Sequence, residues 1–317
     1  MLNHLHIQNY RLFRDLHIDK LGQVNLIAGK NNTGKTALLE ALKLLVSRTN
    51  EQQLNNEISL SIISRGDDDV SNISTLYNRK NILENLPESK IISINELVLT
   101  EAKNLDFFVS FKNNLGVNVL KELRLESRPK EGIHEGYTSV NIDTHGKIND
   151  LLWNQIALTP DEDDAVKVLQ IIDSKIVKLN VNSGQAKVLI KGQPRPIPLK
   201  NLGDGANRLL TLALALVNAK NKMLLIDEFE VGLHHSVQEQ LWDIIFKYAK
   251  EWNIQVFVTT HSQDTLRSFY YVAEKTPQYK EMANYFTLSR KGDGDVKAIN
   301  YDLEDIETSI LANLEIR

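Results

Sequence analysis

Residues 29–36 read Gly29-Lys30-Asn31-Asn32-Thr33-Gly34-Lys35-Thr36, which fits the pattern G-x-x-x-x-G-K-[ST]. The apolar run Val24-Asn25-Leu26-Ile27 precedes this stretch, and a helical pattern of apolar residues begins at Ala37. A glycine-rich turn between a strand and a helix aims backbone N–H groups and the positive end of the helix dipole at an anion. This context predicts a phosphate-binding loop. The alternative is an ordinary strand-to-helix turn with a chance lysine.

The pattern also assigns tasks to single residues of the loop. Lys35 is expected to reach the β- and γ-phosphates of a nucleotide, and the Thr36 hydroxyl is expected to ligate Mg²⁺. The remaining nucleotide contacts are predicted for Gly29, Asn31, Asn32, Thr33 and Gly34. The loop therefore predicts a nucleotide and its metal as cofactors.

A second apolar strand, Met223 to Ile226, ends in the neighbouring carboxylates Asp227 and Glu228. Side chains alternate across a strand, so these two point differently and can hold different roles. Asp227 is predicted to hold Mg²⁺ through water, and Glu228 to orient or deprotonate the water that attacks the γ-phosphate. The alternative is a buried strand with an acidic end.

A third apolar strand, Ile254 to Val258, is followed by Thr259-Thr260-His261-Ser262. At the carboxyl edge of a parallel sheet, His261 would face the same crevice as Asp227. We predict that His261 senses the γ-phosphate. A lone histidine is more commonly structural, and the prediction depends on its position one strand after the acidic pair.

Gly203-Asp204-Gly205 lies just before a leucine-rich helix, predicted from Leu209 to Ala219. Backbone donors at such a helix start suit an anion, so Asp204 and Gly205 are candidates for a phosphate contact. Considered alone, the segment fits a simple loop-to-helix junction equally well.

The remaining segments allow weaker inferences. Alternation predicts strands at 4–9 and 16–18, joined by a turn near the glycine loop. In that turn Arg11 and Arg14 could touch phosphate or adenine, or be solvated surface charges. Period-two spacing predicts an antiparallel meander from Ile91 to Arg128. Its basic residues are a candidate nucleic-acid face, with exposed strand charge as the commoner explanation: Lys112, Lys121, Arg124, Arg128 and Lys130.

Three further local features are a helix-start pattern, an acidic run and a histidine pair. Thr159-Pro160-Asp161-Glu162 has the form of a helix start, and the helix is predicted to run to about Asp173. Asp67-Asp68-Asp69 invites a metal site but fits an exposed loop better. The pair His234-His235 shows no third ligand in the sequence, so a zinc site is not predicted there.

Composition sets limits on the class of protein. The chain has 317 residues, 42% hydrophobic and 25% charged, as in an ordinary globular protein. It contains no cysteine, which rules out disulfides and thiol catalysis and fits a reducing cytoplasm. We expect no membrane span, because no apolar run approaches about 20 residues. The formal net charge of −4 leaves room for only a local basic face.

Taken together, these segments resemble the ABC-type ATPases of the RecF, SMC and OLD (overcoming lysogenization defect) group, and most closely the compact bacterial AAA family ATPases of the AAA15/AAA21 type. Residues 29–36 correspond to the family's Walker A motif, 224–228 to Walker B and 233–235 to the D-loop. His261 corresponds to the switch histidine, and Asn9-Tyr10-Arg11 to a turn that approaches the phosphates. The family's signature loop has serine where this chain has Asp204. The glutamine of the Q-loop has no clear counterpart.

The resemblance implies an α/β P-loop NTPase fold of the ABC-type head, with a mixed central sheet, an antiparallel β-subdomain and a small helical insertion. Residues 1–50 and 200–317 would form the core, and residues 51–199 the insertion. It further implies ATP and Mg²⁺ as cofactors. A head-to-tail homodimer or higher oligomer follows, in which the signature loop of one subunit completes the ATP site of another.

The leading functional hypothesis is a cytoplasmic ATPase switch that acts on DNA and regulates a nuclease in anti-phage defence. The 33 residues from Tyr285 to Arg317 are too few for the TOPRIM nuclease of full-length OLD proteins, and the middle lacks an HNH-like set. We therefore expect any nuclease, HNH or TOPRIM, to be a separate chain. The alternatives are a RecF-like DNA-repair ATPase and a nearly inactive ATP-binding scaffold.

Overall fold

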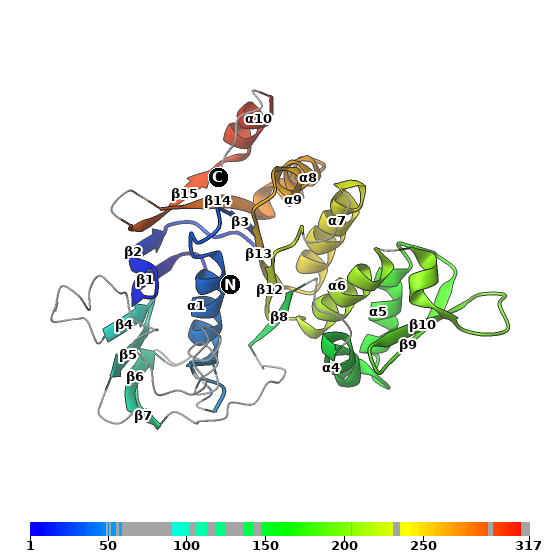
Figure 1. Ribbon diagram of the computed structural model, residues 1–317, viewed down its shortest axis with the longest axis horizontal. Helices are drawn as coiled ribbons and strands as arrows, with labels where there is room; N and C mark the ends of the chain where they lie inside the picture. The colour runs from blue at the N-terminus through cyan, green and yellow to red at the C-terminus, as the bar shows by residue number, and fades with distance from the viewer. Residues whose placement is uncertain are drawn as a thin grey trace.

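The computed structural model in Figure 1 describes residues 1–48, 50, 52–54, 57–58, 91–101, 106–112, 118–124, 136–141, 147–203, 205–230, 235–290 and 294–311. The triple aspartate at 67–69 and the basic side chains proposed between 112 and 130 lie outside the residues whose side chains are described. In the described part, helices pack between and around two six-stranded sheets and one three-stranded sheet. The predicted α/β class is confirmed.

The central sheet has the strand order β15-β14-β3-β13-β12-β8. Parallel pairing joins β8, β12, β13, β3 and β14, and only β15 runs antiparallel to its neighbour. The sheet is therefore mixed, as predicted. Its strands are β3 (Val24–Ala28), β8 (Tyr137–Asn141), β12 (Met223–Asp227), β13 (Gln255–Thr260), β14 (Ala283–Arg290) and β15 (Val296–Tyr301).

The second six-stranded sheet is antiparallel, in the order β2-β1-β4-β5-β6-β7. The predicted meander forms its last four strands, and pairing of β1 with β4 joins the meander to the N-terminal hairpin. The strands are β1 (Leu5–Tyr10), β2 (Phe13–Ile18), β4 (Ile91–Ile94), β5 (Leu97–Glu101), β6 (Asp106–Lys112) and β7 (Asn118–Arg124). The second strand begins at Phe13, three residues before the predicted start.

Helix α1 (Lys35–Ser47) lies between the two sheets in Figure 1. Its leucines pack into a core shared with the inner face of the antiparallel sheet and one face of the central sheet. The other face of the central sheet packs against α6 (Ala206–Asn218), α7 (His235–Glu251) and α8 (Gln263–Ala273). The central sheet is thus covered on both faces, as its continuous apolar strands require.

A smaller unit packs against α6. It consists of α4 (Lys147–Ile156), α5 (Asp161–Leu169), the strands β9 (Ile176–Asn182), β10 (Gln185–Ile190) and β11 (Ile197–Pro198), and the 3₁₀ turn η2 (Leu199–Leu202). The C-terminal part adds α9 (Pro277–Met282) and α10 (Leu303–Leu311). The proposed division into a core and an insertion at 51–199 stays a prediction.

Two helix ends differ from the prediction. Helix α5 ends at Leu169 rather than near Asp173, because the chain turns there to enter β9. Helix α6 begins at Ala206, three residues earlier than predicted, and most of its residues are buried. Among the helices that the described residues form, none combines the length and the apolar character needed to cross a membrane.

Candidate functional site

The glycine loop leaves the carboxyl end of β3 and leads into α1. Gly34 precedes the helix with a φ of 99°, which side-chain-bearing residues rarely adopt. A Cβ at Gly34 would lie 2.9 Å from the ring of Phe13. The N-terminal hairpin therefore packs directly on the loop, and glycine is required there for both reasons.

The other loop residues show how the loop holds its shape. The Thr33 hydroxyl donates to the Lys30 carbonyl at 2.9 Å, and Thr33 is buried. Asn31 and Asn32 are exposed, and Asn32 has a positive φ of 64°. The Lys35 ammonium donates to the Gly29 carbonyl at 2.6 Å and to the Lys30 carbonyl at 3.0 Å. The lysine thus lies folded over its own loop.

The ends of β12 and β13 meet the start of α1. The Thr36 hydroxyl donates to Asp227 Oδ2 at 3.1 Å, although the two residues are 191 positions apart. Thr259, at the end of β13, donates from its hydroxyl to Asp227 Oδ1. The same oxygen of Thr259 accepts the Glu228 backbone N–H at 2.9 Å. A single hydroxyl therefore fixes both members of the acidic pair.

Glu228 leaves the strand with a φ of 53°, in the left-handed region that costs a non-glycine residue energy. Its side chain is exposed, whereas the next residue, Phe229, is fully buried. The turn therefore presents the Glu228 carboxylate at the carboxyl edge of the sheet while the chain continues into the core.

His261 is held by a glutamate that the sequence analysis did not single out. Glu230 Oε1 accepts the His261 backbone N–H at 2.7 Å and lies 2.5 Å from the ring Nδ1. Glu230 Oε2 accepts the Thr260 hydroxyl at 2.7 Å. The Glu230 side chain is 9% exposed and that of His261 46%. A buried carboxylate thus orients a half-exposed imidazole.

The signal for Glu230 was present in the run Asp227-Glu228-Phe229-Glu230. The strand ends at Asp227, so strand alternation does not predict where the Glu230 side chain points. What the run could not indicate was the partner, because Thr260 and His261 come from another strand 30 and 31 residues away.

The electrostatics of Lys35 link these groups. Burial lowers the pKa of its ammonium, and the carboxylates of Glu230, Asp227 and Glu228 oppose that effect. The net pKa lies below the ordinary lysine value. All three carboxylates therefore act electrostatically on Lys35, and the lysine, the acidic pair and the histidine-bearing strand end converge on one edge of the sheet.

Arg11 lies in the turn between β1 and β2, but it is not the solvated surface charge that one alternative described. Its side chain is 4% exposed, and its Nε lies 2.8 Å from Glu40 Oε2 of α1 and 3.2 Å from the Tyr10 hydroxyl. Burial lowers the pKa of Arg11, but Tyr10 and Glu40 raise it by more. The residue ties the hairpin to α1, and its contact with phosphate stays a prediction.

The structure does not gather every predicted residue at this edge. Gly205 precedes α6, and a Cβ added there would meet Val237 of α7 at 3.8 Å. Asp204 and His234 lie outside the described residues, as does the side chain of His235. Two glutamines, Gln52 and Gln53, follow α1, and the backbone N–H of Gln53 donates to Asn50 Oδ1 at 3.0 Å.

The donor set suits a nucleotide with a divalent cation. Mg²⁺ prefers oxygen ligands, and the Thr36 hydroxyl and the Asp227 carboxylate supply them side by side. The lysine and the start of α1 supply positive charge for phosphates. Bound Mg²⁺ would neutralise phosphate charge during transfer of the terminal phosphoryl group.

Two family models match the chain on either side of its middle. The first, described as "AAA ATPase domain", matches residues 1–123. The second, described as "AAA domain, putative AbiEii toxin, Type IV TA system", matches residues 141–267. Between them they contain the glycine loop, the acidic pair and His261.

A relative from Helicobacter pylori, named "ATP/GTP phosphatase", is 26% identical over 319 residues, covering 83% of this chain and 86% of its own. Among solved structures, the SMC head domain from Thermotoga maritima aligns with a TM-score of 0.53 at 15% identity, covering 95% of this chain and 99% of that one. An SMC head bound to the C-terminal winged-helix domain of ScpA aligns with a TM-score of 0.56 at 14% identity, covering 95% and 98%. At these identities the two structures establish the fold alone.

Proposed function

We propose, from the premise that this chain is an ABC-type AAA ATPase, that it is the switch subunit of a bacterial anti-phage defence system. In this role it acts on DNA in the cytoplasm and regulates a separately encoded nuclease. Support for a defence role comes from the family described as a putative AbiEii toxin, whose model matches residues 141–267. DNA action and the nuclease partner rest on the resemblance to RecF, SMC and OLD proteins.

In the proposed mechanism, each residue at the sheet edge has its own task. Lys35 would leave its loop carbonyls to contact the β- and γ-phosphates, Thr36 would ligate Mg²⁺, and Asp227 would hold the ion through water. Glu228 accepts a proton from the attacking water, and His261 donates a hydrogen bond toward the γ-phosphate. Glu230 positions His261, and Thr259 positions both members of the acidic pair.

Gly205 is the observation that supports a two-copy site. Its φ of −75° is open to any residue, and among the described residues beyond its chain neighbours and its own helix, the nearest atom to an added Cβ is Val237 Cγ1, at 3.8 Å. The described part of the single chain therefore gives no steric reason for glycine at this position. A close approach by something outside the chain would require it, and we assign that approach to the nucleotide of a second, head-to-tail copy.

The proposal is tested by measuring ATP turnover with and without duplex DNA and by purifying the protein with the products of its neighbouring genes. We expect DNA to change turnover and a nuclease to co-purify. If DNA leaves ATP turnover unchanged and no nuclease co-purifies with the protein, the proposal is wrong. Salt-sensitive, ATP-dependent DNA binding without a nuclease would instead indicate a repair ATPase.

A further inference from the structure

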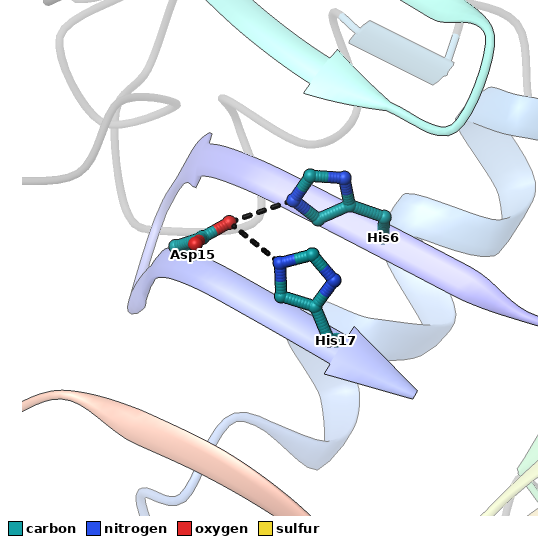
Figure 2. Close-up of side chains that lie close together, drawn as sticks. All are labelled: His6, Asp15 and His17. Carbon is teal, nitrogen blue, oxygen red and sulfur yellow. Dashed lines mark hydrogen bonds and ion pairs between the residues drawn. The ribbon is translucent and has the colours of Figure 1, made fainter. Parts of the chain in front are cut away.

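His6, Asp15 and His17 form a cluster on the outer face of the N-terminal hairpin, away from the glycine loop. In the register of β1 and β2, His6 lies directly opposite His17, and Asp15 is two residues before His17 on the same strand. Because alternate residues share a face, all three side chains point to the same side. Figure 2 shows the carboxylate of Asp15 between the hairpin strands, with both imidazole rings turned toward it.

The distances are close to those of a metal site. His17 Nε2 lies 3.3 Å and His6 Nε2 lies 2.6 Å from the same oxygen, Asp15 Oδ1. Two ligand atoms on a tetrahedral zinc ion are about 3.3 Å apart when each bond is about 2.0 Å long. The distance between His17 Nε2 and Asp15 Oδ1 already has that value. The His6 ring needs to withdraw by about 0.7 Å, and because the two rings are stacked nearly parallel, one of them must also turn so that both Nε2 lone pairs point at the same ion.

The backbone beneath the cluster is fixed. The His6 N–H donates to Asn95 Oδ1 at 2.6 Å, and the His6 carbonyl accepts the Asn95 N–H at 2.8 Å. On the opposite face of the same strands, Leu5, Ile7, Leu16 and Ile18 are buried in the core. The metal-facing side chains therefore start from a rigid pair of strands, which lowers the ordering cost of binding.

The arrangement of the two rings is poorly suited to a purely ionic cluster. Their centroids are 3.8 Å apart and their planes differ by 19°, so protonating both would place two positive charges face to face. A cation bound to both Nε2 atoms and to Asp15 Oδ1 needs each ring neutral, with its N–H on Nδ1 and the Nε2 lone pair free for the ion. Neutral imidazole with a carboxylate is a ligand set that Zn²⁺ accepts.

We propose that His6, Asp15 and His17 bind one Zn²⁺ ion, or a similar late first-row divalent ion, as a clasp across the β1–β2 hairpin. The fourth position faces solvent, where water completes the tetrahedron. Binding requires that His6 Nε2 carry no proton, so the neutral ring must be in the Nδ1–H tautomer. The site is independent of the proposed nucleotide chemistry, and its test does not depend on ATP turnover.

The test is a calorimetric titration of the full chain with Zn²⁺, without nucleotide or Mg²⁺, together with Co²⁺ absorption as a report on coordination geometry. We expect one ion per chain, a tetrahedral Co²⁺ spectrum and a rise in Tm that saturates at one equivalent. His6→Gln and His17→Gln should each weaken binding at least about 10-fold, the loss that removal of a mere outer-shell partner causes. The double variant should lose both the binding and the rise in Tm.

Two matched variants control for other histidines. His4→Gln removes an exposed imidazole two residues before His6, and His261→Gln removes the one paired with Glu230. Both should keep the stoichiometric Zn²⁺ ion. Binding that survives the folded His6→Gln/His17→Gln variant, or that disappears in His261→Gln, would overturn the proposal. Should the double variant fail to fold, a wild-type NMR spectrum without Zn²⁺-induced shifts in the His6 and His17 rings would overturn it equally.

Discussion

Glu228 is the side chain on which turnover depends most in this account. Its backbone has a positive φ, its side chain is exposed, and its N–H donates to the Thr259 hydroxyl at 2.9 Å. Glu228→Gln keeps the shape of the side chain and removes its capacity to accept a proton. We expect turnover to fall at least about 100-fold while ATP affinity is retained. Phosphate release and ATP titration measure the two, and unchanged turnover would support the scaffold alternative.

Glu230 acts through His261, so the effect of a Glu230 substitution on the ATP turnover rate should depend on whether His261 is present. Glu230→Gln leaves the imidazole without its carboxylate, and a misplaced catalytic group can cost up to about 100-fold in rate. We expect kcat to fall while the KM for ATP stays unchanged. In a His261→Gln background the same substitution should have little further effect, because the two residues work as a unit. Additive losses in the double variant would contradict this role.

Arg11 and Glu40 form an ion pair that joins the hairpin to α1, and both side chains are largely shielded from solvent, with exposures of 4% and 13%. Removing one partner of such a pair leaves an uncompensated charge, so Arg11→Ala should lower the free energy of unfolding by about 3 kcal/mol. Urea unfolding measures the loss. A double-mutant cycle with Glu40→Gln serves as the control. A variant as stable as the parent, or a cycle without coupling, would exclude a structural role for the pair.

For single residues, the sequence allowed a prediction where the residues that would bind the nucleotide lie together in one short motif. The lysine and threonine of the glycine loop were predicted because their spacing is local. Glu230 and Thr259 were not assigned roles, because each acts on a partner at least 30 residues away. The roles of the predicted site residues themselves stay predictions until variants are measured.

Among the elements, α5 and α6 are joined by a charge cluster that should respond to pH. Lys220 Nζ lies 2.6 Å from Asp161 and 2.5 Å from Asp164. Burial lowers the pKa of Lys220, but its hydrogen bonds to the two carboxylates raise it by more. For Asp164, burial raises the pKa, but hydrogen bonds from Lys167 and Lys220 lower it by more, so the pKa lies below the ordinary value.

The signs of these shifts define a window. The Asp164 contribution is present above the ordinary carboxyl pKa of 3.8 and is lost as the pH falls through the lower folded pKa. The Lys220 contribution is present below 10.5 and is lost as the pH rises through the higher folded pKa. Lys220→Met should therefore cost about 1 kcal/mol of unfolding free energy at neutral pH, and less at both extremes.

Denaturant unfolding across that pH range checks the window. Lys167→Met is the matched control, since Lys167 also bonds Asp164 but its side chain is 62% exposed. It should cost less than Lys220→Met at every pH. If the two variants lose equal unfolding free energy, or if the loss in Lys220→Met does not change with pH, the assignment is wrong.

The elements themselves followed largely from periodicity. The meander, the acidic strand and the histidine-bearing strand appear where alternation and apolar runs place them. Sheet order did not follow, because pairing of Ile7 with Ile94 or of Met223 with Tyr137 joins strands far apart in the chain. Alternation shows which face of a strand is buried, but not which strand lies beside it.

For the whole molecule, the central claim is that two copies complete each other's ATP sites. Lys35→Ala disables the glycine loop, and Gly205→Asp disables the surface proposed to close the partner's site. Among the described residues beyond its chain neighbours and its own helix, the nearest atom to a Cβ added at 205 is 3.8 Å away, so the first atom of an aspartate side chain has space there. Both variants should therefore fold, and each alone should hydrolyse little ATP.

Mixing the two inactive variants tests this claim most directly. In a mixed dimer, one site combines an intact Lys35 from one copy with an intact Gly205 from the other. ATP turnover measured against the mixing ratio should reappear and reach its maximum near equal amounts. A mixture that stays as inactive as its components, or a Gly205→Asp variant as active alone as the parent protein, would contradict the account.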